Sequence, residues 1–553
     1  ASIFAGCTHA SGDTPTGERT FDMNQAPSAG KSGISTAQVQ TTDTTSTTKI
    51  AFQGNSIVVD GPGAAVNKTT VTITTSGNYH LTGALTDGQI IVNAGKRDIV
   101  RLILDNVDIR SESCSPLLSL QSDKLIVTLA DGTTNYLSDP DEYTFDPAEI
   151  DGLEAALYCK GPLQLDGTGT LVVQGNGDLG IASSDSLIIS SGNFEVFSAG
   201  TGILAKDSLS ILSGRFTVKA GVDAIRCDRG KDGGDEFSGL HIRNGAFEIV
   251  SERSGLSSGE AMSISGGTIR ISAAGGPTDV ATAEASDIPG LSARGPVVIS
   301  GGKLEVESPG DAIYSKDDID ISNGILTLNS GAQGIRSEGA LSISGGTMNM
   351  EVRGESLNGN PIAVSGGAVF SDSGATSQTE PGSLRMNGGF ICATRPFPRP
   401  QWDASQLHIR GGIFLLSSPV LDTAATDDAS EPEVTVSGGT FVYTGDGDAV
   451  PAVRQQGSIV LYYQGVQPAN QLLYITNASG TPVLVYAPSS AYRTVVISSS
   501  LFRADDAYTI YAGGQAAGEE TGGFYPAATV CSGGREMASF TFTDSRTEVE
   551  LSR

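Results

Sequence analysis

The sequence predicts an all-β protein whose main body is a right-handed parallel β-helix with three strands per coil and a 22-residue coil period. A stretch within residues 310–346 occurs twice, because Ala312-Ile-Tyr-Ser-Lys returns 22 residues later as Gly334-Ile-Arg-Ser-Glu. Turn glycines recur from Gly169 to Gly439, mostly at steps of 21 to 23 residues. Repeats of this size are typical of solenoids, in which each unit packs only on its neighbours. The 71 glycines and the scarcity of Leu-, Ala- and Glu-rich stretches favour short strands over helices.

Each repeat divides into three short strands, which in one unit span 312–316, 318–322 and 325–330. Because the side chains of a strand alternate between its two faces, aligned units predict which side chains stack in the interior. The second and third strands supply aliphatic and Phe pairs such as Leu187/Ile189 and Phe194/Val196. The first strands supply an aliphatic column and, two positions later, a column of small residues: Leu157, Ile181, Ile203, Ile225, Leu256, Leu291, Ile313 and Ile335, then Cys159, Ser183, Ala205, Cys227, Ser258, Ala293, Ser315 and Ser337.

Each coil is expected to advance by one strand spacing, about 4.8 Å, and the preference for right-handed crossovers predicts the hand of the coil. Two steps are longer than the rest, at 31 and 35 residues. Insertions explain both: "RGKDGGDEFS" follows Asp228 and "PTDVATAEASDIP" follows Gly276.

The two ends of the chain depart from the repeat. Strand-like segments at 71–73, 90–92, 100–104 and 125–129 predict irregular first coils. From Gln456 onward, strands alternate with turns in a hairpin pattern, which predicts an antiparallel β cap over the unpaired strand edges of the solenoid. The predicted domains are therefore a leader and polar tether at 1–48, a parallel β-helix at 49–455 and a C-terminal β cap at 456–553.

Charge and cysteine content narrow the classes of function. With 34 basic and 62 acidic side chains the formal net charge is −28, so the average surface repels nucleic acid. The six cysteines form no CxxC pair, which argues against a zinc motif. Cys159 and Cys227 fall in one inward column three coils apart, roughly 14 Å, which is too far for a disulfide. We interpret both as small core residues.

The N-terminal "IFAGC" is similar to the end of a bacterial lipoprotein signal, with Cys7 as the residue that receives the lipid. The polar segment that follows, to about Thr48, has the composition of a tether. A chance Ala-Gly-Cys is the alternative. The chain contains no run of 18 apolar residues. These features predict an extracellular, lipid-anchored protein on a bacterial cell surface.

Several motifs together resemble a family of bacterial carbohydrate-binding proteins with a pectin-lyase-like right-handed β-helix. They are "AIYSKDDIDISNG" and its repeats, "SGNYHLTGALTDGQIIVNA", "VRLILDNVDI" and "YRTVVISSSLFRADDAYTIYAGG", and the resemblance covers about residues 64–548. It implies a secreted or surface-attached, calcium-containing and non-catalytic binder of acidic plant polysaccharide of the polygalacturonate (pectin) type, with cellulose as a further ligand. Trp402 is the single tryptophan, so the planar tryptophan row of many cellulose binders is missing, which disfavours cellulose.

Outward positions of the first strands predict a binding strip for the acidic polysaccharide. Eight basic and tyrosine side chains fall on this face of an otherwise acidic protein: Tyr158, Lys160, Lys206, Arg226, Arg294, Tyr314, Lys316 and Arg336. Lys and Arg would hydrogen-bond uronate carboxylates, and Tyr would stack on sugar rings. The alternative is that they are ordinary solvated residues paired with Asp185, Asp207 and Asp317.

Calcium is the predicted cofactor, held by acidic residues. The first insertion places Asp228, Asp232, Asp235 and Glu236 on one glycine-rich loop, with Asp223 just before the preceding strand. Oxygen-rich flexible loops suit the 6–8 oxygen ligands of calcium. Asp185 and Asp207, stacked on adjacent coils, form a second candidate. A bound calcium ion would also bridge the protein to an acidic polymer. A solvated acidic loop is the alternative.

Two other functions remain open at this point. A structural or adhesive surface protein, self-assembling through its polar N-terminal segment or end to end, is the first. A pectate-type polysaccharide lyase is the second. The "NTD", "GHG" and "RIK" segments that polygalacturonases share are missing, and "TRPFPRP" around Arg395 and Arg399 does not match the RxPxxR spacing of some lyases. The sequence therefore predicts a binding protein and not an enzyme.

Overall fold

The computed structural model describes residues 47–144, 154–228, 238–277, 287–372, 384–394, 407–418, 433–446, 450–527, 529–543 and 545–551. The chain divides into two units, 1–45 and 46–553. The first unit lies outside the described residues, and with it the predicted anchor Cys7 and nearly all of the tether. The domain boundaries predicted from the sequence stay predictions.

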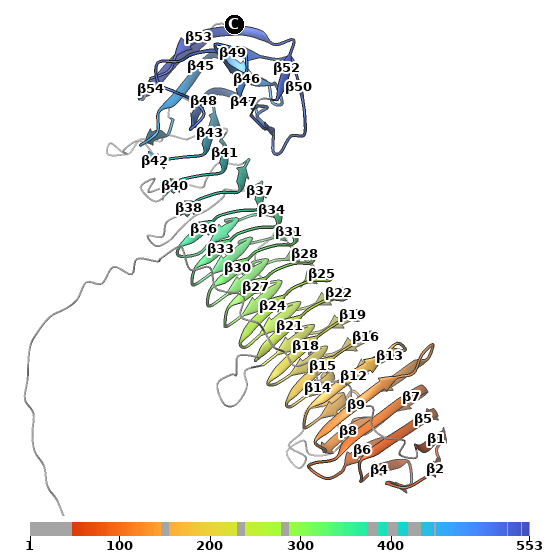
Figure 1. The fold of residues 1–553 in the computed structure, drawn as a ribbon. Coiled ribbons are helices and arrows are strands. Elements are labelled where there is room, and N and C mark those ends of the chain that lie inside the picture. The colour runs from red at the N-terminus through yellow and green to blue at the C-terminus, as the bar shows by residue number, and fades with distance from the viewer. Residues whose placement is uncertain are drawn as a thin grey trace, which may run out of the picture. The chain divides into compact units, whose positions relative to one another are not determined.

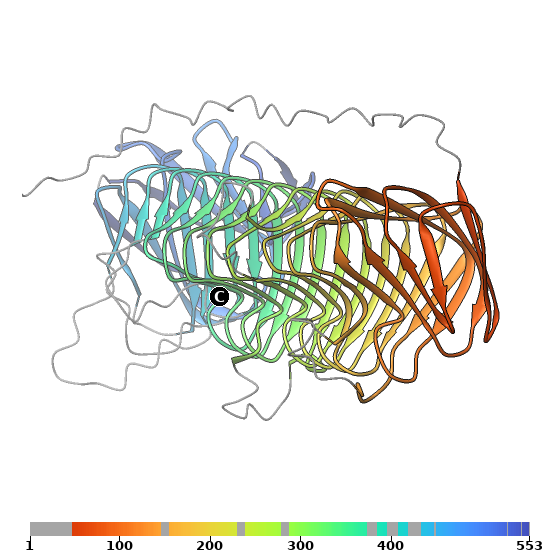
Figure 2. The ribbon, with the colours of Figure 1, turned by 90° about the horizontal axis from the view of Figure 1, so that it is seen from below.

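Short strands stack in three columns of the main body, as Figures 1 and 2 show. The first column is a sheet in which every pairing after the opening hairpin is parallel. It consists of β3 (Ala64–Asn67), β4 (Thr70–Ile73), β6 (Gln89–Asn93), β8 (Leu117–Gln121), β11 (Ala155–Cys159), β14 (Leu179–Ser183), β17 (Ile203–Ala205), β20 (Ile225–Cys227), β23 (Leu256–Ser258), β26 (Leu291–Ala293), β29 (Ile313–Ser315), β32 (Ile335–Ser337) and β35 (Leu357–Asn358).

The second column holds the second strand of each coil, again in parallel pairings. It consists of β9 (Lys124–Leu129), β12 (Leu163–Gly167), β15 (Ser186–Ile189), β18 (Ser208–Ile211), β21 (Gly239–Ile242), β24 (Ala261–Ile264), β27 (Val297–Ile299), β30 (Ile319–Ile321), β33 (Leu341–Ile343), β36 (Ile362–Val364), β38 (Leu384–Met386), β40 (Leu407–Ile409), β42 (Glu433–Val436) and β44 (Ala452–Arg454).

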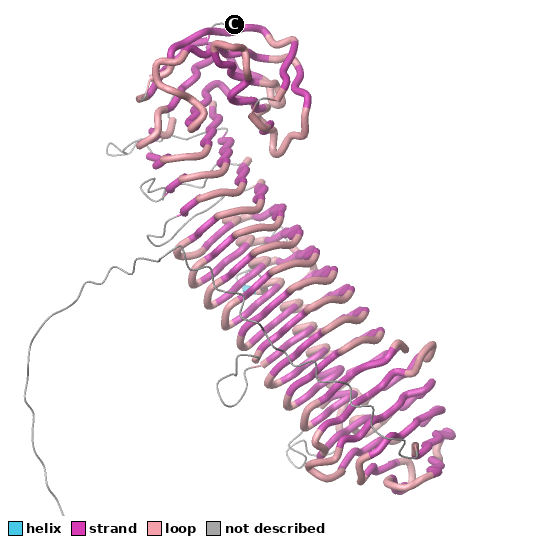
Figure 3. Tube along the Cα trace, viewed as in Figure 1, coloured by secondary structure: helices cyan, strands magenta, loops and turns pink. Residues whose placement is uncertain are grey.

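The third column follows the glycine turns and is parallel throughout. It consists of β10 (Thr134–Ser138), β13 (Thr170–Gly175), β16 (Asn193–Ser198), β19 (Arg215–Ala220), β22 (Ala246–Ser251), β25 (Thr268–Ala273), β28 (Lys303–Ser308), β31 (Ile325–Ser330), β34 (Thr347–Val352), β37 (Ala368–Ser371), β39 (Phe390–Ala393), β41 (Ile413–Ser418) and β43 (Thr440–Gly445). In Figure 3 strand and loop alternate regularly along these coils. Three columns of parallel strands are the arrangement of a parallel β-helix.

The predicted interior ladder is confirmed. Ile181 pairs with Ile203 and Ile203 with Ile225, and all three side chains are buried. The next two steps lead to Leu256 and Leu291 across the two insertions. The small-residue column is also buried, including Cys159 and Cys227, whose thiols are free. The right-handed sense of the coil stays a prediction.

Aromatic rings stack inside the third column. Phe194 and Phe216 have ring centres 5.2 Å apart and an interplanar angle of 13°, and Phe216 and Phe247 follow at 4.6 Å and 4°. These residues occupy equivalent positions of β16, β19 and β22. The repeat therefore stacks these three rings on consecutive coils, and Ile269 takes the equivalent position on the coil after Phe247.

Glycine pairs at the turn between the second and third columns let the coils approach closely. A Cβ added at Gly345 would collide with the carbonyl oxygen of Ser322 on the preceding coil, and one at Gly366 would collide with that of Ser344. Gly346 also has φ +85°, which L side chains rarely adopt. The turn glycines of the repeat are thus a steric requirement of coil stacking.

The chain before the regular coils contributes four longer or edge strands. β1 (Thr48–Gly54) pairs antiparallel with β2 (Ile57–Asp60) and parallel with β5 (Gly77–Leu85). β5 pairs parallel with β7 (Ile99–Arg110), which in turn pairs with β9 and β10. The first coils are therefore irregular, as the sequence predicts.

The C-terminal part forms the predicted antiparallel sheet. β48 (Tyr492–Ser499) pairs antiparallel with β43 and with β45 (Ser458–Gln467), which pairs with β54 (Arg546–Leu551). The separate five-stranded sheet runs in the order β51 (Phe524–Tyr525), β47 (Pro482–Tyr486), β46 (Leu473–Asn477), β49 (Ala507–Ala512) and β53 (Arg535–Thr541), and β50 (Gln515–Ala517) pairs with β52 (Val530–Ser532). Pairing of β48 with β43 covers the last open edge of the third column. Within the described ranges, no helix is long and apolar enough to cross a membrane.

Candidate functional site: an arginine groove on the first column

A groove with a cavity volume of 620 Å³ lies on the outer face of the first column. Its floor and ends are the outward residues of five consecutive strands, which pair in the order Arg226, Ser257, Ser292, Tyr314 and Arg336. Because β23 and β26 present only serines, a gap opens between the larger side chains at either end. Four strand spacings separate Arg226 from Arg336, about 19 Å. We name this site the arginine groove; its charged lining residues are Arg226, Arg253, Arg294, Arg336, Asp223, Asp228, Asp287 and Asp311.

One end of the groove is held by an arginine between two aspartates. Nε of Arg226 is 2.6 Å from Oδ1 of Asp228, and its NH1 is 3.7 Å from Oδ2 of Asp223. The backbone N–H of Ser254, on the next coil, donates to Oδ1 of Asp223 at 3.1 Å. Asp223 is buried, which raises its carboxyl pKa above the ordinary value, while Arg226 offsets part of that rise.

The other end repeats this arrangement. Asp311 is buried, accepts a hydrogen bond from the backbone N–H of Gln333 at 3.0 Å and lies 3.5 Å from NH1 of Arg336. Burial raises the pKa of Asp311, and the Gln333 N–H and Arg336 partly oppose the shift. Cζ of Arg336 lies 5.1 Å from the ring centre of Tyr314. Burial, aided by a hydrogen bond to Glu338, raises the pKa of the Tyr314 hydroxyl to about 12.

The remaining two arginines differ from this pair. Arg253 precedes β23 and Arg294 follows β26, and the side chain of neither makes an ion pair or hydrogen bond with any residue in the described ranges. Four arginines and four aspartates line the described groove, so their formal charges cancel, in a protein whose net charge is −28. The groove is thus formally neutral, whereas the protein as a whole is strongly acidic.

The groove lies where the repeat is interrupted. Asp228 directly precedes the stretch 229–237 and Asp287 directly follows 278–286, which are the cores of the two insertions. Loops attached to a regular scaffold are the usual carriers of binding function. The two lengthened coils therefore flank the groove at residues that line it.

The structure brings together half of the predicted binding strip. Arg226, Arg294, Tyr314 and Arg336 line the groove. Three lysines do not line it in the described structure: Lys160 and Lys316 are exposed and Lys206 is half-buried, each just after a strand of the first column.

The prediction that Tyr158 is exposed and stacks on sugar rings is wrong. This tyrosine is fully buried in an apolar cluster with Leu118, Ala182 and Leu204, and its hydroxyl is 2.8 Å from that of Ser184. The alternation of side chains between the two faces of a strand predicted its direction correctly. An outward side chain is exposed, however, only if nothing packs on that face.

Three charged groove residues were missed from the sequence: Arg253, Asp287 and Asp311. All three lie before first-column strands and not in the strands themselves. A signal was available, because Asp311 stands two residues before the buried Ile313, as Asp223 does before Ile225. Aligning the turns as well as the strands would have found it.

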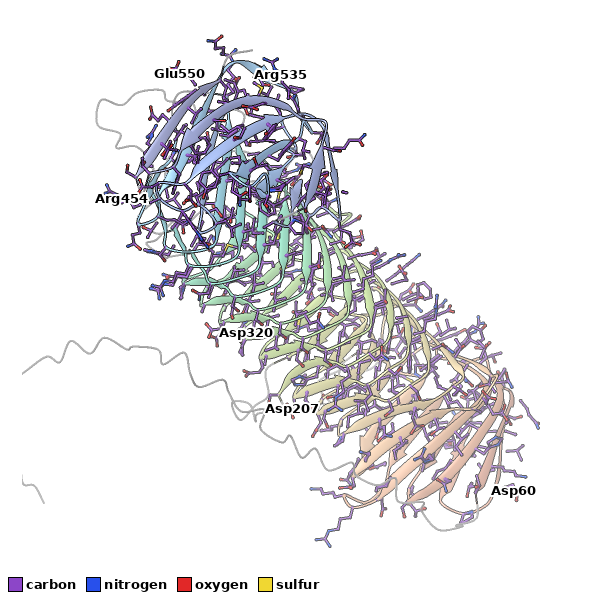
Figure 4. The ribbon with its side chains drawn as sticks, turned by 45° about the horizontal axis from the view of Figure 1, so that its top comes forward. Asp60, Asp207, Asp320, Arg454, Arg535 and Glu550 are labelled. Carbon is purple, nitrogen blue, oxygen red and sulfur yellow. The ribbon has the colours of Figure 1, made fainter. Side chains whose placement is uncertain are left out.

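The predicted calcium ligands are only partly within the described residues. Asp232, Asp235 and Glu236 lie outside them. Asp223 and Asp228 both face the guanidinium group of Arg226, which already neutralises them where a shared cation would lie. Oδ1 of Asp185 accepts from the N–H of Ser186 at 2.6 Å, and Asp207, labelled in Figure 4, has a partner of its own. No group of three or more His, Cys, Asp or Glu arranged to hold a metal occurs in the described part of the chain.

A second groove, of 530 Å³, lies along the third column. Its described lining includes Glu305, Glu307, Glu351 and Asp372 beside Phe370, with no Lys or Arg. We name it the acidic groove. An acidic polymer would be repelled there, which distinguishes it from the arginine groove.

Comparison with known proteins agrees with the resemblance drawn from the motifs. Residues 67–334 match a family model described as "Carbohydrate-binding domain-containing protein", which confirms the resemblance over this part of the chain. A curated protein of the same description from Acetivibrio thermocellus is 33% identical over 168 residues, 30% of this chain and 58% of that protein. The match thus spans less than two thirds of the relative's length.

A solved structure is also similar, that of a "polysaccharide lyase-like protein from C. thermocellum". It is 26% identical, covers 46% of this chain and 96% of its own, and has a TM-score of 0.41. All lining residues of the arginine groove except Arg336, two residues further on, fall inside the segment that matches the carbohydrate-binding family model.

Proposed function

We propose that this chain is a non-catalytic polysaccharide-binding protein and that the arginine groove binds a segment of an acidic plant polysaccharide of the polygalacturonate (pectin) type. One observation carries the proposal: four arginines line a groove with a serine floor, and two of them, Arg253 and Arg294, make no ion pair with a carboxylate of the described residues, Arg253 acting on Asp223 only at longer range. The match of residues 67–334 to a carbohydrate-binding family supports the class of ligand.

The chemistry of the groove suits a uronate polymer. Guanidinium groups bind carboxylates with two parallel hydrogen bonds, and Arg is less strongly hydrated than Lys, so it gives up water at lower cost. Ser257 and Ser292 offer hydroxyls that both donate and accept hydrogen bonds with sugar hydroxyls. A groove about 19 Å long accommodates several sugar residues of a linear chain in place of a single monosaccharide.

The proposal that the groove binds the polymer without cleaving it rests on the protonation and ion pairing of its charged side chains. Cleavage of an acidic polysaccharide by elimination needs a base that removes a proton from the sugar. The arginines of the groove stay protonated at all ordinary pH values. Asp223, Asp228 and Asp311 are held by arginines, so Asp287 is the one groove carboxylate that makes no ion pair with a described residue.

Calorimetry with polygalacturonate tests the proposed function. We expect Arg253→Ala/Arg294→Ala to weaken binding at least tenfold, because charge-assisted hydrogen bonds to the ligand are lost. The matched control is Lys160→Ser/Lys206→Ser, which removes two positive charges from the same column outside the groove and should change affinity less than threefold. Equal losses in both variants would place binding elsewhere. Unsaturated sugar products on long incubation would instead support the lyase alternative.

Calcium and location are part of the proposal. We propose that calcium is held chiefly by Asp232, Asp235 and Glu236, since Asp223 and Asp228 are engaged by Arg226. Replacing these three acids with Asn and Gln should abolish the heat of calcium binding, and an undiminished heat would rule the loop out. We also propose an extracellular, lipid-anchored protein, which membrane fractionation of Cys7→Ser against the native chain would test.

A further inference from the structure

Three of the four aspartates in the arginine groove already hold arginines of that groove. Asp223 and Asp228 lie against Arg226, and Asp311 lies against Arg336. Asp287 is exposed and makes no ion pair with any residue in the described ranges. The groove therefore contains two kinds of arginine: Arg253 and Arg294, which form no ion pair there although Arg253 acts on Asp223 at longer range, and Arg226 and Arg336, each of which is ion-paired with a carboxylate of the protein.

An occupied arginine binds a ligand carboxylate only by sharing or giving up its own partner. Asp311 cannot swing aside into solvent, because it is only 8% exposed and is tied to the Gln333 N–H at 3.0 Å. Its negative charge also repels an incoming anion. Binding at Arg336 is thus opposed by a fixed charge 3.5 Å from the guanidinium, and binding at Arg226 by Asp228 at 2.6 Å.

We propose that Asp228 and Asp311 are specificity-determining residues of the arginine groove, which act as internal counter-ions and restrict binding to polymers with several closely spaced anionic groups. This rests on the proposed function of the groove. A run of adjacent uronates engages Arg253 and Arg294 first and then draws Arg226 and Arg336 away from the aspartates at both ends. A single uronate, or a polymer in which most carboxyls are methyl esters, offers too few carboxylates to replace the ion pairs that Arg226 and Arg336 would lose.

Acidification also releases Arg336, because a protonated Asp311 no longer forms an ion pair with its guanidinium group. The charged and titratable groups that act on Asp311 are Arg336 on β32, Glu355 before β35 and Tyr314 on β29, besides the Gln333 N–H. Burial raises the pKa of Asp311, so it takes up a proton while carboxyls of ordinary acidity are still charged. Binding of polygalacturonate should therefore strengthen as the pH falls from neutral toward the range in which Asp311 takes up its proton.

The experiment uses the full chain with Asp311→Asn, Asp228→Asn and the double variant. Asn keeps an oxygen that accepts the Gln333 N–H, and thermal melts check folding. The matched control is Asp320→Asn, which removes the same charge from an exposed position outside the groove without freeing an arginine. The probes are polygalacturonate, the same polymer with most carboxyls methyl-esterified, and monomeric galacturonic acid.

We expect each single variant to bind polygalacturonate about five- to tenfold more tightly at pH 7, while the control changes less than twofold. The double variant should also gain measurable binding of the esterified polymer. In Asp311→Asn the increase on acidification should shrink, whereas the control should keep it.

A weaker affinity in folded Asp228→Asn and Asp311→Asn would show that these aspartates orient the arginines, and would overturn the inference. Unchanged affinity in both, with the native chain binding well, would overturn it and leave the proposed function intact. Absence of polygalacturonate binding by the native chain and by every variant would remove the proposed function, and the inference with it.

Discussion

Arg336 lies across the ring of Tyr314, with its Cζ 5.1 Å from the ring centre, while its NH1 faces Asp311 at 3.5 Å. The face of Tyr314 that Arg336 covers is not free to stack on a sugar, contrary to the role expected for this tyrosine from the sequence. The ring supports the guanidinium instead, through a cation–π contact.

This relationship predicts different effects for two substitutions of Tyr314. Tyr314→Phe keeps the ring and loses only the hydroxyl that donates to Glu338, so polygalacturonate affinity should stay within twofold. Tyr314→Ala removes the support of Arg336 and should weaken binding about threefold. Calorimetry at one pH and salt concentration measures both, and a large loss in Tyr314→Phe would instead assign the hydroxyl a direct role.

A second prediction concerns the glycine turns. Gly345→Ala places a Cβ against the carbonyl oxygen of Ser322, and the fixed backbone of the neighbouring coil cannot move aside. We expect a loss of about 1–3 kcal/mol in the free energy of unfolding, the usual cost of overpacking. The control is Gly161→Ala, where the nearest atom would be 3.6 Å away. Equal melting temperatures for the two variants would contradict the steric account.

A third prediction concerns Asp139, which lies beside β10 and is 3% exposed. It accepts hydrogen bonds from the Tyr143 hydroxyl at 2.7 Å and from the Asn176 N–H at 2.5 Å. Burial raises its pKa to about 6 in spite of these bonds. The folded state therefore binds the proton more tightly than the unfolded state, and stability falls as the pH rises from about 4 through 6.

Asp139→Asn removes this titration. Relative to the native chain, the variant should gain stability, on the order of 2 kcal/mol, as the pH rises across that window. Chemical unfolding at pH 4, 5, 6 and 7 measures the difference, with the exposed Asp320→Asn as control (Figure 4). A difference between variant and native chain that does not depend on pH would show that Asp139 is not the titrating group.

A fourth prediction separates the cysteines by reactivity. Cys159, Cys227 and Cys392 are buried, and burial raises their thiol pKa to about 11, 12 and 11. Cys114 and Cys531 are only partly buried. A short pulse of iodoacetamide on the native protein, followed by peptide mass spectrometry, should label Cys114 and Cys531 at least tenfold more than the other three. Rapid labelling of Cys159 would mean that the first coils open readily.

The interior was predictable from the sequence and the outer surface was not. Ile181, Ile203 and Ile225 follow from a fixed step and from the alternation of strand side chains, both local properties. Tyr158 shows the limit, because its burial depends on what packs over the outer face, which the period does not encode. The pairing of Arg226 with two aspartates, and the gap left by Ser257 and Ser292, arise from differences between neighbouring repeats, which an average over the repeats hides.

The register of the coils also makes the molecule adjustable in length. Thr170 of β13 pairs with Asn193 of β16, which pairs with Arg215 of β19 in an equivalent position. Excising 193–214 would join Gly192 to Arg215 and let β13 meet β19 directly, with the buried Leu171 and Val173 facing the buried Phe216 and Val218. Whole coils can thus be removed as units. Each removal would shorten the distance between the first coils and the arginine groove by about 4.8 Å, with no redesign of either part.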